Sequence, residues 1–316
     1  MSQSTISLTF EDLYNEIADY LGYGRSPASD RLAEVKRYAN EGCARFLLGL
    51  DPRTHRAYTW SFLAPHATIT LWASVPTGAT TVSGTASGGS TNLTASAASF
   101  YASMIGHEIT ITDVGTFTIT ACTSGTEITV SGDATCSGKT FSIDADGTCT
   151  LPDDFAYLID DFHYAAGGPG GGLRPATVQE IRAMRSGGSS TGTPRWYAVQ
   201  PRAFGPETGQ RWEVLVHPVP GSDHTPHYRY RMSPDKMVND ADYPVGGSLH
   251  AQTVLACCLA LAEERKNDGQ TLHQDRAREL LGASIDLDAK NKPGSLGYNG
   301  DRSVCGWDRR GTVTYS

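Results

Sequence analysis

The segment from Pro76 to Gly147 differs in composition from the rest of the chain and limits the folds available to it. Its only lysine or arginine is Lys139, and Thr, Ser, Gly and Ala make up most of its other residues. Short apolar runs with a period of two recur between turn residues: Ile109/Ile111, Phe117/Ile119, Ile128/Val130 and Phe141/Ile143. This alternation is typical of antiparallel strands with one buried face. Because that face can form a core, we predict an inserted all-β, sandwich-like module over 76–148 rather than a disordered linker.

Helical patterns stand on both sides of this module. Thr9 and Asp12 form a capping-box-like pair at the start of an apolar stripe with helical spacing, and Gly22 ends the stripe. A second stripe is followed by Asp51-Pro52, which cannot continue a helix. The spacing of apolar residues predicts helices at about 9–21, 29–48, 177–185, 248–266 and 270–290.

Strand-like stretches occur among these helices, at 68–72, 155–164, 195–199, 212–217 and 227–232. We expect Phe46, Leu47, Trp60 and Phe62 to share one core. The sequence therefore predicts an α+β fold in three parts. These are a helical bundle with a small antiparallel sheet (1–75 and 149–292), the inserted β-module (76–148) and an extended C-terminal docking tail (293–316).

The charge and the cysteines limit the class of protein. A formal charge of −8 argues against a nucleic-acid-binding module, although a uniformly acidic wall could line a channel through which DNA slides. The seven cysteines show no CxxC spacing, which predicts reduced thiols in a protein made in a cytoplasm. No apolar run approaches the roughly 20 residues of a membrane span, and residues 1–5 do not resemble the start of a signal peptide.

Several motifs suggest chemistry but fit a structural role better. His217, His224 and His227 match no metal template and are expected to flank a hairpin turn. Asp144-Ala-Asp-Gly147 begins like a calcium loop, but Phe155 stands where the twelfth-position Glu is needed. Gly188–Gly192 matches GxSxG, yet a helix is expected before the serine instead of a strand.

Two further patterns are equally weak. The glycine-rich run Gly167–Gly172 lacks the Lys-Ser/Thr of a P-loop and is expected to act as a hinge or mobile loop. The carboxylate pairs Asp153/Asp154 and Asp160/Asp161 are sequence neighbours, which point to opposite faces of an extended chain. The sequence therefore predicts no catalytic residue, no cofactor and no metal, and we expect that the protein is not an enzyme.

A series of short segments, taken in order, resembles the phage head-tail adaptors of the connector or tail-tubular type. The segments are Tyr38-Ala-Asn-Glu-Gly-Cys-Ala-Arg-Phe46, Trp60-Ser-Phe-Leu-x-Pro65, Leu151-Pro-Asp-Asp-Phe155, Thr177-Val-Gln-Glu-Ile-Arg182, Pro194-Arg-Trp-Tyr-Ala198, Val216-His-Pro-Val-Pro220 and Tyr228-Arg-Tyr230, before a helix rich in small residues. The resemblance covers roughly residues 8–75 and 149–290. The β-module and the C-terminal tail lie outside it.

The resemblance implies a structural virion protein in the neck of a tailed phage, assembled in the cytoplasm of the bacterial host. It implies a ring, of twelve subunits in this family, that binds the portal and the tail or tail-tube proteins. DNA would pass through the channel of the ring without sequence-specific binding. No membrane is involved.

The C-terminal tail has no periodicity with which to fold alone, yet it is rich in aromatic and arginine residues, which anchor interfaces. We expect it to dock on the portal or a neighbouring subunit through Tyr298, Trp307, Arg309, Arg310 and Tyr315.

Two other interpretations stay open. The chain could be a different tail or stopper subunit. Alternatively, the β-module could bind carbohydrate or a host surface.

Overall fold

The computed structural model describes residues 6–78, 80–165, 168–169, 171–188, 190–202, 209–266 and 271–291. The chain forms two compact units, each described here by itself. Unit 1 combines the two ends of the chain, up to Ser61 and from Lys236 onward, and unit 2 runs from Phe62 to Asp235.

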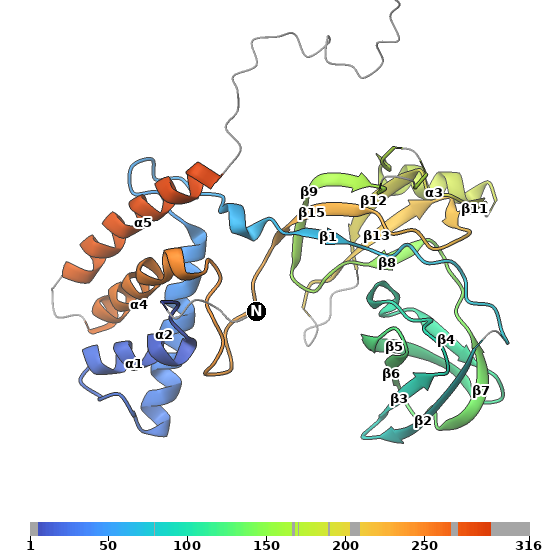
Figure 1. Cartoon of the computed structure of the whole chain (residues 1–316), viewed down its shortest axis with the longest axis horizontal. Coiled ribbons are helices and arrows are strands. Elements are labelled where there is room, and N and C mark those ends of the chain that lie inside the picture. Colours follow the sequence, from blue (N-terminus) through green and yellow to red (C-terminus); the bar gives the residue numbers. More distant parts are fainter. Residues whose placement is uncertain are drawn as a thin grey trace, which may run out of the picture. The chain divides into compact units, whose positions relative to one another are not determined.

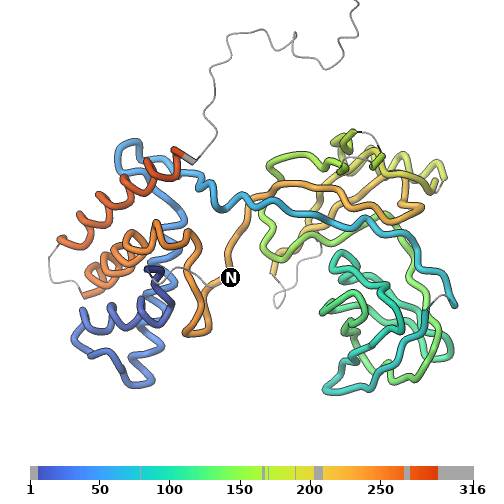
Figure 2. The backbone as a smooth tube through the Cα atoms, viewed as in Figure 1, coloured from blue at the N-terminus to red at the C-terminus, as the bar shows by residue number. Residues whose placement is uncertain are grey.

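Unit 1 is helical in its described part. Its helices are α1 (Phe10–Tyr20), α2 (Ser29–Leu48), α4 (Ala251–Lys266) and α5 (Leu272–Asn291). Figure 2 shows that the blue helices of the N-terminal segment lie beside the orange and red helices of the C-terminal segment. At the closest approach, a Cβ on Gly42 would lie 2.5 Å from the Cα of Cys258, so α2 and α4 pack together only because this residue is glycine.

Local signals explain where these helices begin and end. The Thr9 side chain and the Asp12 carboxylate cap each other's backbone N–H groups at the start of α1, which is the predicted capping box. Gly49, with a left-handed φ of 58°, ends α2. The helix predicted over 29–48 is confirmed at both ends.

Unit 2 contains a closed six-stranded barrel, the green and teal strands of Figure 1. Its strands are β2 (Thr81–Ser87), β3 (Ser90–Ala95), β4 (Glu108–Ile111), β5 (Gly115–Ser124), β6 (Glu127–Ser131) and β7 (Cys136–Ser142). They follow the order β2-β3-β6-β5-β4-β7, and β7 closes the barrel by pairing with both β2 and β4. The inward residues Leu93, Ile119 and Ile128 are fully buried.

Two further sheets complete unit 2. One is three-stranded, in the order β1-β15-β9, with β1 (His66–Thr68), β15 (His227–Met232) and β9 (Phe155–His163). The other is four-stranded, in the order β10-β12-β13-β8, with β10 (Arg174–Pro175), β12 (Trp196–Pro201), β13 (Trp212–His217) and β8 (Thr148–Thr150). The remaining elements of unit 2 are the pair β11 (Thr191–Gly192) and β14 (Val219–Pro220), helix α3 (Val178–Ser186) and the 3-10 helix η2 (Ala102–Met104). The 3-10 helix η1 (Ser61–Leu63) lies at the boundary of the two units in the sequence, and η3 (Ser248–His250) belongs to unit 1.

The predicted fold class is wrong. Strands account for 32% of the chain and helices for 31%, so it is not a helical bundle with a small sheet. The inserted segment is a closed barrel and not a sandwich. The reason is that period-two alternation marks which side chains are buried but leaves open which strands pair, and a sandwich and a barrel bury the same face of each strand.

The compact units do not follow the predicted grouping of segments. The predicted adaptor domain places 62–75 and 149–235 with the helices, whereas these segments share a unit with the barrel. One continuous core runs through that unit, from Val130 in the barrel to Trp72, Val214 and Tyr228 outside it. The barrel is therefore packed into the surrounding sheets.

Candidate functional site

The three histidines that the sequence places together do not form a site. His217 ends β13 and His227 begins β15, and these strands belong to different sheets. The expected hairpin between them is therefore wrong. The His227 ring instead stacks on that of His66, with ring centroids 5.2 Å apart. Within the described residues, no group of three or more His, Cys, Asp or Glu side chains is arranged to hold a metal ion.

The other motifs take structural positions. Helix α3 precedes Ser190, the central serine of the GxSxG match, and the two-residue strand β11 follows it, which is not the strand–turn–helix order of a nucleophile elbow. The adjacent carboxylates have separate partners: Asp153 pairs with Arg211, while Asp154 accepts the hydroxyl of Tyr230. The glycine-rich run 167–172 is described only in part.

The predicted docking residues Tyr298, Trp307, Arg309, Arg310 and Tyr315 lie outside the described residues. Their role as a partner-binding segment stays a prediction.

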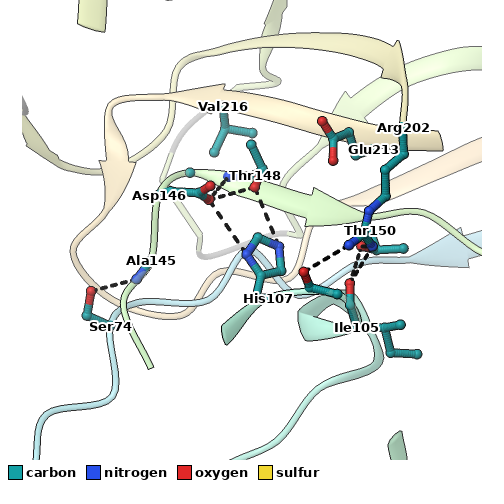
Figure 3. Close-up of polar contacts among 12 residues, drawn as sticks. Ser74, Ile105, His107, Ala145, Asp146, Thr148, Thr150, Arg202, Glu213 and Val216 are labelled. Atoms are coloured by element: carbon teal, nitrogen blue, oxygen red, sulfur yellow. Dashed lines mark hydrogen bonds and ion pairs between the residues drawn. The ribbon is translucent and has the colours of Figure 1, made fainter. Parts of the chain in front are cut away.

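The most concentrated polar network lies where the barrel meets the sheet (Figure 3). The Oδ1 atom of Asp146 accepts hydrogen bonds from the backbone N–H of Thr148 at 2.8 Å and from its hydroxyl at 2.6 Å. His107 lies beside both residues, with Nε2 3.5 Å from the Thr148 hydroxyl and Nδ1 3.9 Å from Asp146. Burial lowers the pKa of His107, which favours its neutral form.

This Thr–His–Asp group is not arranged for nucleophilic catalysis. A working base lies about 2.6–3.2 Å from the proton that it removes. The Thr148 hydroxyl already donates to the Asp146 carboxylate, so its proton is directed away from the imidazole. The arrangement instead closes the turn that leads out of the barrel.

Arg202 completes the network from the sheet side, as Figure 3 shows. Its guanidinium donates to the carbonyls of Ile105 at 2.8 Å and Gly106 at 2.9 Å, and to the Thr150 hydroxyl at 3.2 Å. Gly106 has a φ of +83°, and a Cβ there would lie 1.5 Å from the Arg202 Nη2 atom. Only glycine fits this contact, so the guanidinium packs directly against the barrel backbone.

Replacing Arg202 with methionine is expected to lower the free energy of unfolding by about 2–3 kcal/mol, because the half-buried Gly106 carbonyl loses its donor and the Ile105 carbonyl keeps only the Thr150 hydroxyl. The matched control is Arg211→Met, at a neighbouring position where the arginine pairs with the 70%-exposed Asp153 side chain. That variant should cost less than about 1 kcal/mol. Urea unfolding followed by circular dichroism measures both, and equal losses would contradict the role given to Arg202.

The second candidate is an open sheet edge at β9. The strand is the last of the order β1-β15-β9, and its register with β15 leaves the other side of residues 156–161 without a strand partner in the described part of the chain. Tyr157 and Ile159 project from one face of this strand, and they are 53% and 39% exposed. An exposed apolar edge strand is a template for pairing with another chain.

Sequence reasoning located this strand but not its edge position. The predicted stretch 155–164 matches β9 closely. Which strands flank β9 depends on residues 66–68 and 227–232, far away in the chain. The sequence therefore carried no signal that one side of the strand is free.

Comparison with known proteins does not identify a family for this chain. No protein-family model matches the chain, and no curated protein sequence matches it significantly. Among the described helices, none combines the length and the apolar character that crossing a membrane requires.

Proposed function

We propose that this chain is a structural virion protein of a tailed phage, a head-to-tail adaptor. It forms a ring between portal and tail and continues the DNA channel, and it has no catalytic role. The ordered series of segments that resembles the adaptors supports this proposal at the level of sequence. The portal on one side and tail or tail-tube proteins on the other are its partners in the neck of the virion.

The observation that carries the proposal is the sheet β1-β15-β9, whose unlike end strands have no further strand partner, among the described residues, along β1 and along 156–161 of β9. A closed ring needs two different surfaces on each subunit, so that the front of one copy meets the back of the next. Strands β1 and β9 both run antiparallel to β15, so they are parallel to each other. In the ring, the β9 edge of one copy pairs in parallel with the β1 edge of its neighbour.

Side chains at these edges suit such a contact. A neighbouring strand beside β9 would cover Tyr157 and Ile159, which otherwise leave apolar surface in water. The exposed carboxylates of β9 lie toward its C-terminal end, while β1 begins at His66 and contains no acidic residue. The two edges therefore differ in charge, which favours the β9–β1 contact over β9–β9 pairing.

The net charge of the chain, −8 at pH 7, is compatible with a surface that lines a DNA channel. Negative side chains repel the phosphates of passing DNA and keep it from adhering. No observation favours the carbohydrate-binding alternative for the barrel. Phe100 and Phe141 are buried in its core, and the hydroxyl of Tyr101 is bound to Asp223, whereas sugar-binding sites present exposed aromatic faces.

Replacing Ile159 with lysine is expected to abolish ring assembly, because a charge on the covered face of β9 opposes pairing there. Native mass spectrometry and negative-stain images of the purified full chain measure the outcome. Wild-type protein should form rings with an axial channel wide enough for duplex DNA, and the variant should stay monomeric.

Val238→Lys is the matched control, since Val238 is a 63%-exposed apolar residue of unit 1. It should leave the rings intact. A two-fold wild-type dimer, or rings that survive Ile159→Lys, would exclude the proposed contact.

A further inference from the structure

A cavity of about 590 Å³ opens in unit 2 beside the start of β12. Its lining includes Tyr164, Gly171, Arg174, Arg195 and Trp196. The volume lies within the range of about 300–1,000 Å³ that is typical of small-molecule sites. Gly171 adds only backbone to the wall, and a Cβ there would meet no atom within 4 Å, so the cavity is open on this side.

Two arginines face this cavity without an anion. The backbone N–H of Arg174 donates to the carbonyl of Arg195 at 2.8 Å, which places the backbones of the two residues side by side. Both residues are exposed, and within the described part of the chain neither guanidinium has a carboxylate partner. Two positive charges that line one cavity favour binding of an anion there.

Aromatic rings stand beside these charges. The Arg174 guanidinium lies 5.7 Å from the centre of the Trp196 ring, a cation–π contact that fixes the position of both groups. The Tyr164 hydroxyl donates to the carbonyl of Pro194 at 2.8 Å. Burial raises the pKa of Tyr164 to about 12.

We propose that this cavity binds a nucleoside phosphate, with the phosphate on Arg174 and Arg195 and the base against Trp196. Guanidinium groups match phosphate oxygens in geometry, and aromatic side chains accept any base by stacking. The overall negative charge does not oppose this local site, because charges more than about 10 Å away are largely screened at physiological salt. The phosphate can come from a free nucleotide or from the end of a DNA strand.

An acidic peptide is the competing ligand class. It would use the two guanidinium groups, but it has no need of an enclosed cavity beside aromatic rings. A mononucleotide supplies both an anion and a flat ring in one small molecule. The observations therefore favour the nucleotide.

The test is isothermal titration calorimetry of the full chain with deoxyadenosine monophosphate, inorganic phosphate, deoxyadenosine, a 5′-phosphorylated oligodeoxyadenylate and an acidic tetrapeptide. The monophosphate or the oligonucleotide should bind at least about tenfold more tightly than inorganic phosphate, deoxyadenosine or the peptide. Binding of the mononucleotide indicates a free nucleotide as the source, and binding of the oligonucleotide alone indicates a strand end.

The variants Arg174→Gln and Arg195→Gln should each weaken this binding by about tenfold. The control is Arg182→Gln, which removes one positive charge from an exposed arginine of α3 whose guanidinium donates to Gln200. This variant should change the affinity by less than about twofold. Circular dichroism checks that each variant is folded.

The proposal is overturned if neither the mononucleotide nor the oligonucleotide binds, if inorganic phosphate or the peptide binds equally well, or if Arg182→Gln weakens binding as much as the pocket variants. Nucleotide binding is measured independently of ring assembly. A failure to bind leaves the adaptor proposal standing, and a failure to form rings leaves the nucleotide proposal standing.

Discussion

Replacing Asp288 with alanine is expected to lower the free energy of unfolding by about 3–5 kcal/mol, because it removes several hydrogen bonds to a charged group, each worth about 1.5–3 kcal/mol. Asp288 lies on α5 and is 1% exposed. Its carboxylate accepts hydrogen bonds from the Tyr58 hydroxyl at 2.9 Å and from both the backbone N–H and the hydroxyl of Ser61. Without the carboxylate, these half-buried donors lose this acceptor.

The network also ties the C-terminal helix to the segment that follows α2. Burial, followed by the Asp288 carboxylate, raises the pKa of Tyr58, so the neutral phenol is favoured in the folded protein. A raised tyrosine pKa stabilises the fold below the ordinary tyrosine value of about 10. That contribution is lost as the pH rises through the folded value, and the Asp288→Ala variant should lose part of this alkaline dependence.

Asp286→Ala is the matched control, two residues away on the same helix. The Asp286 side chain is 60% exposed and pairs with Arg53, so its removal should cost less than about 1 kcal/mol. Urea unfolding followed by the helical signal in circular dichroism gives both values. If the two variants are equally stable, Asp288 is not the structural link that its contacts indicate.

Replacing Trp60 with alanine is expected to cost about 3–5 kcal/mol, the range for a large aromatic side chain removed from a core. Trp60 is fully buried, and its ring centre lies 4.7 Å from that of Phe46. Its indole N–H donates to the carbonyls of Phe46 and Leu47 in the last turn of α2, and the Phe46 carbonyl also accepts from the backbone N–H of Gly49. The substitution would therefore leave a cavity and expose a helix end at once.

Trp60→Phe separates these two effects, since it keeps most of the ring volume and removes only the N–H donor. It should cost about 1–2 kcal/mol, close to the cost of leaving buried acceptors without their donor. The same unfolding measurement applies. A loss below about 1 kcal/mol for Trp60→Ala would contradict the buried position. Of the other residues expected in this core, Leu47 and Phe62 are only half-buried.

Much of the local structure followed from the sequence. Thr9 caps α1 together with Asp12, as predicted, and the helix predicted over 29–48 has its predicted bounds. These signals act within four residues, where the backbone hydrogen bonds of a helix are also made, so they can be read without knowing the rest of the fold. Strands β4, β5 and β6 were predicted from the alternation of apolar and polar residues. Strands β2 and β3 were not, because Val82, Leu93 and Ala95 are their only buried apolar residues.

Strand pairing was decided by the tertiary structure alone. Alternation shows which side chains face a core, but the groups that pair strands are backbone N–H and C=O groups, which nearly every residue carries. Closure of the barrel through β7, the separation of His217 from His227, and the free edge of β9 all depend on such pairings between distant segments. So does the cavity lined by Arg174, Arg195 and Trp196, because parallel pairing of β10 with β12 places Arg174 opposite Trp196. The sequence by itself determined where most elements begin and end and which residues they bury. Long-range backbone pairing determined which of those elements meet, and hence where the candidate sites lie.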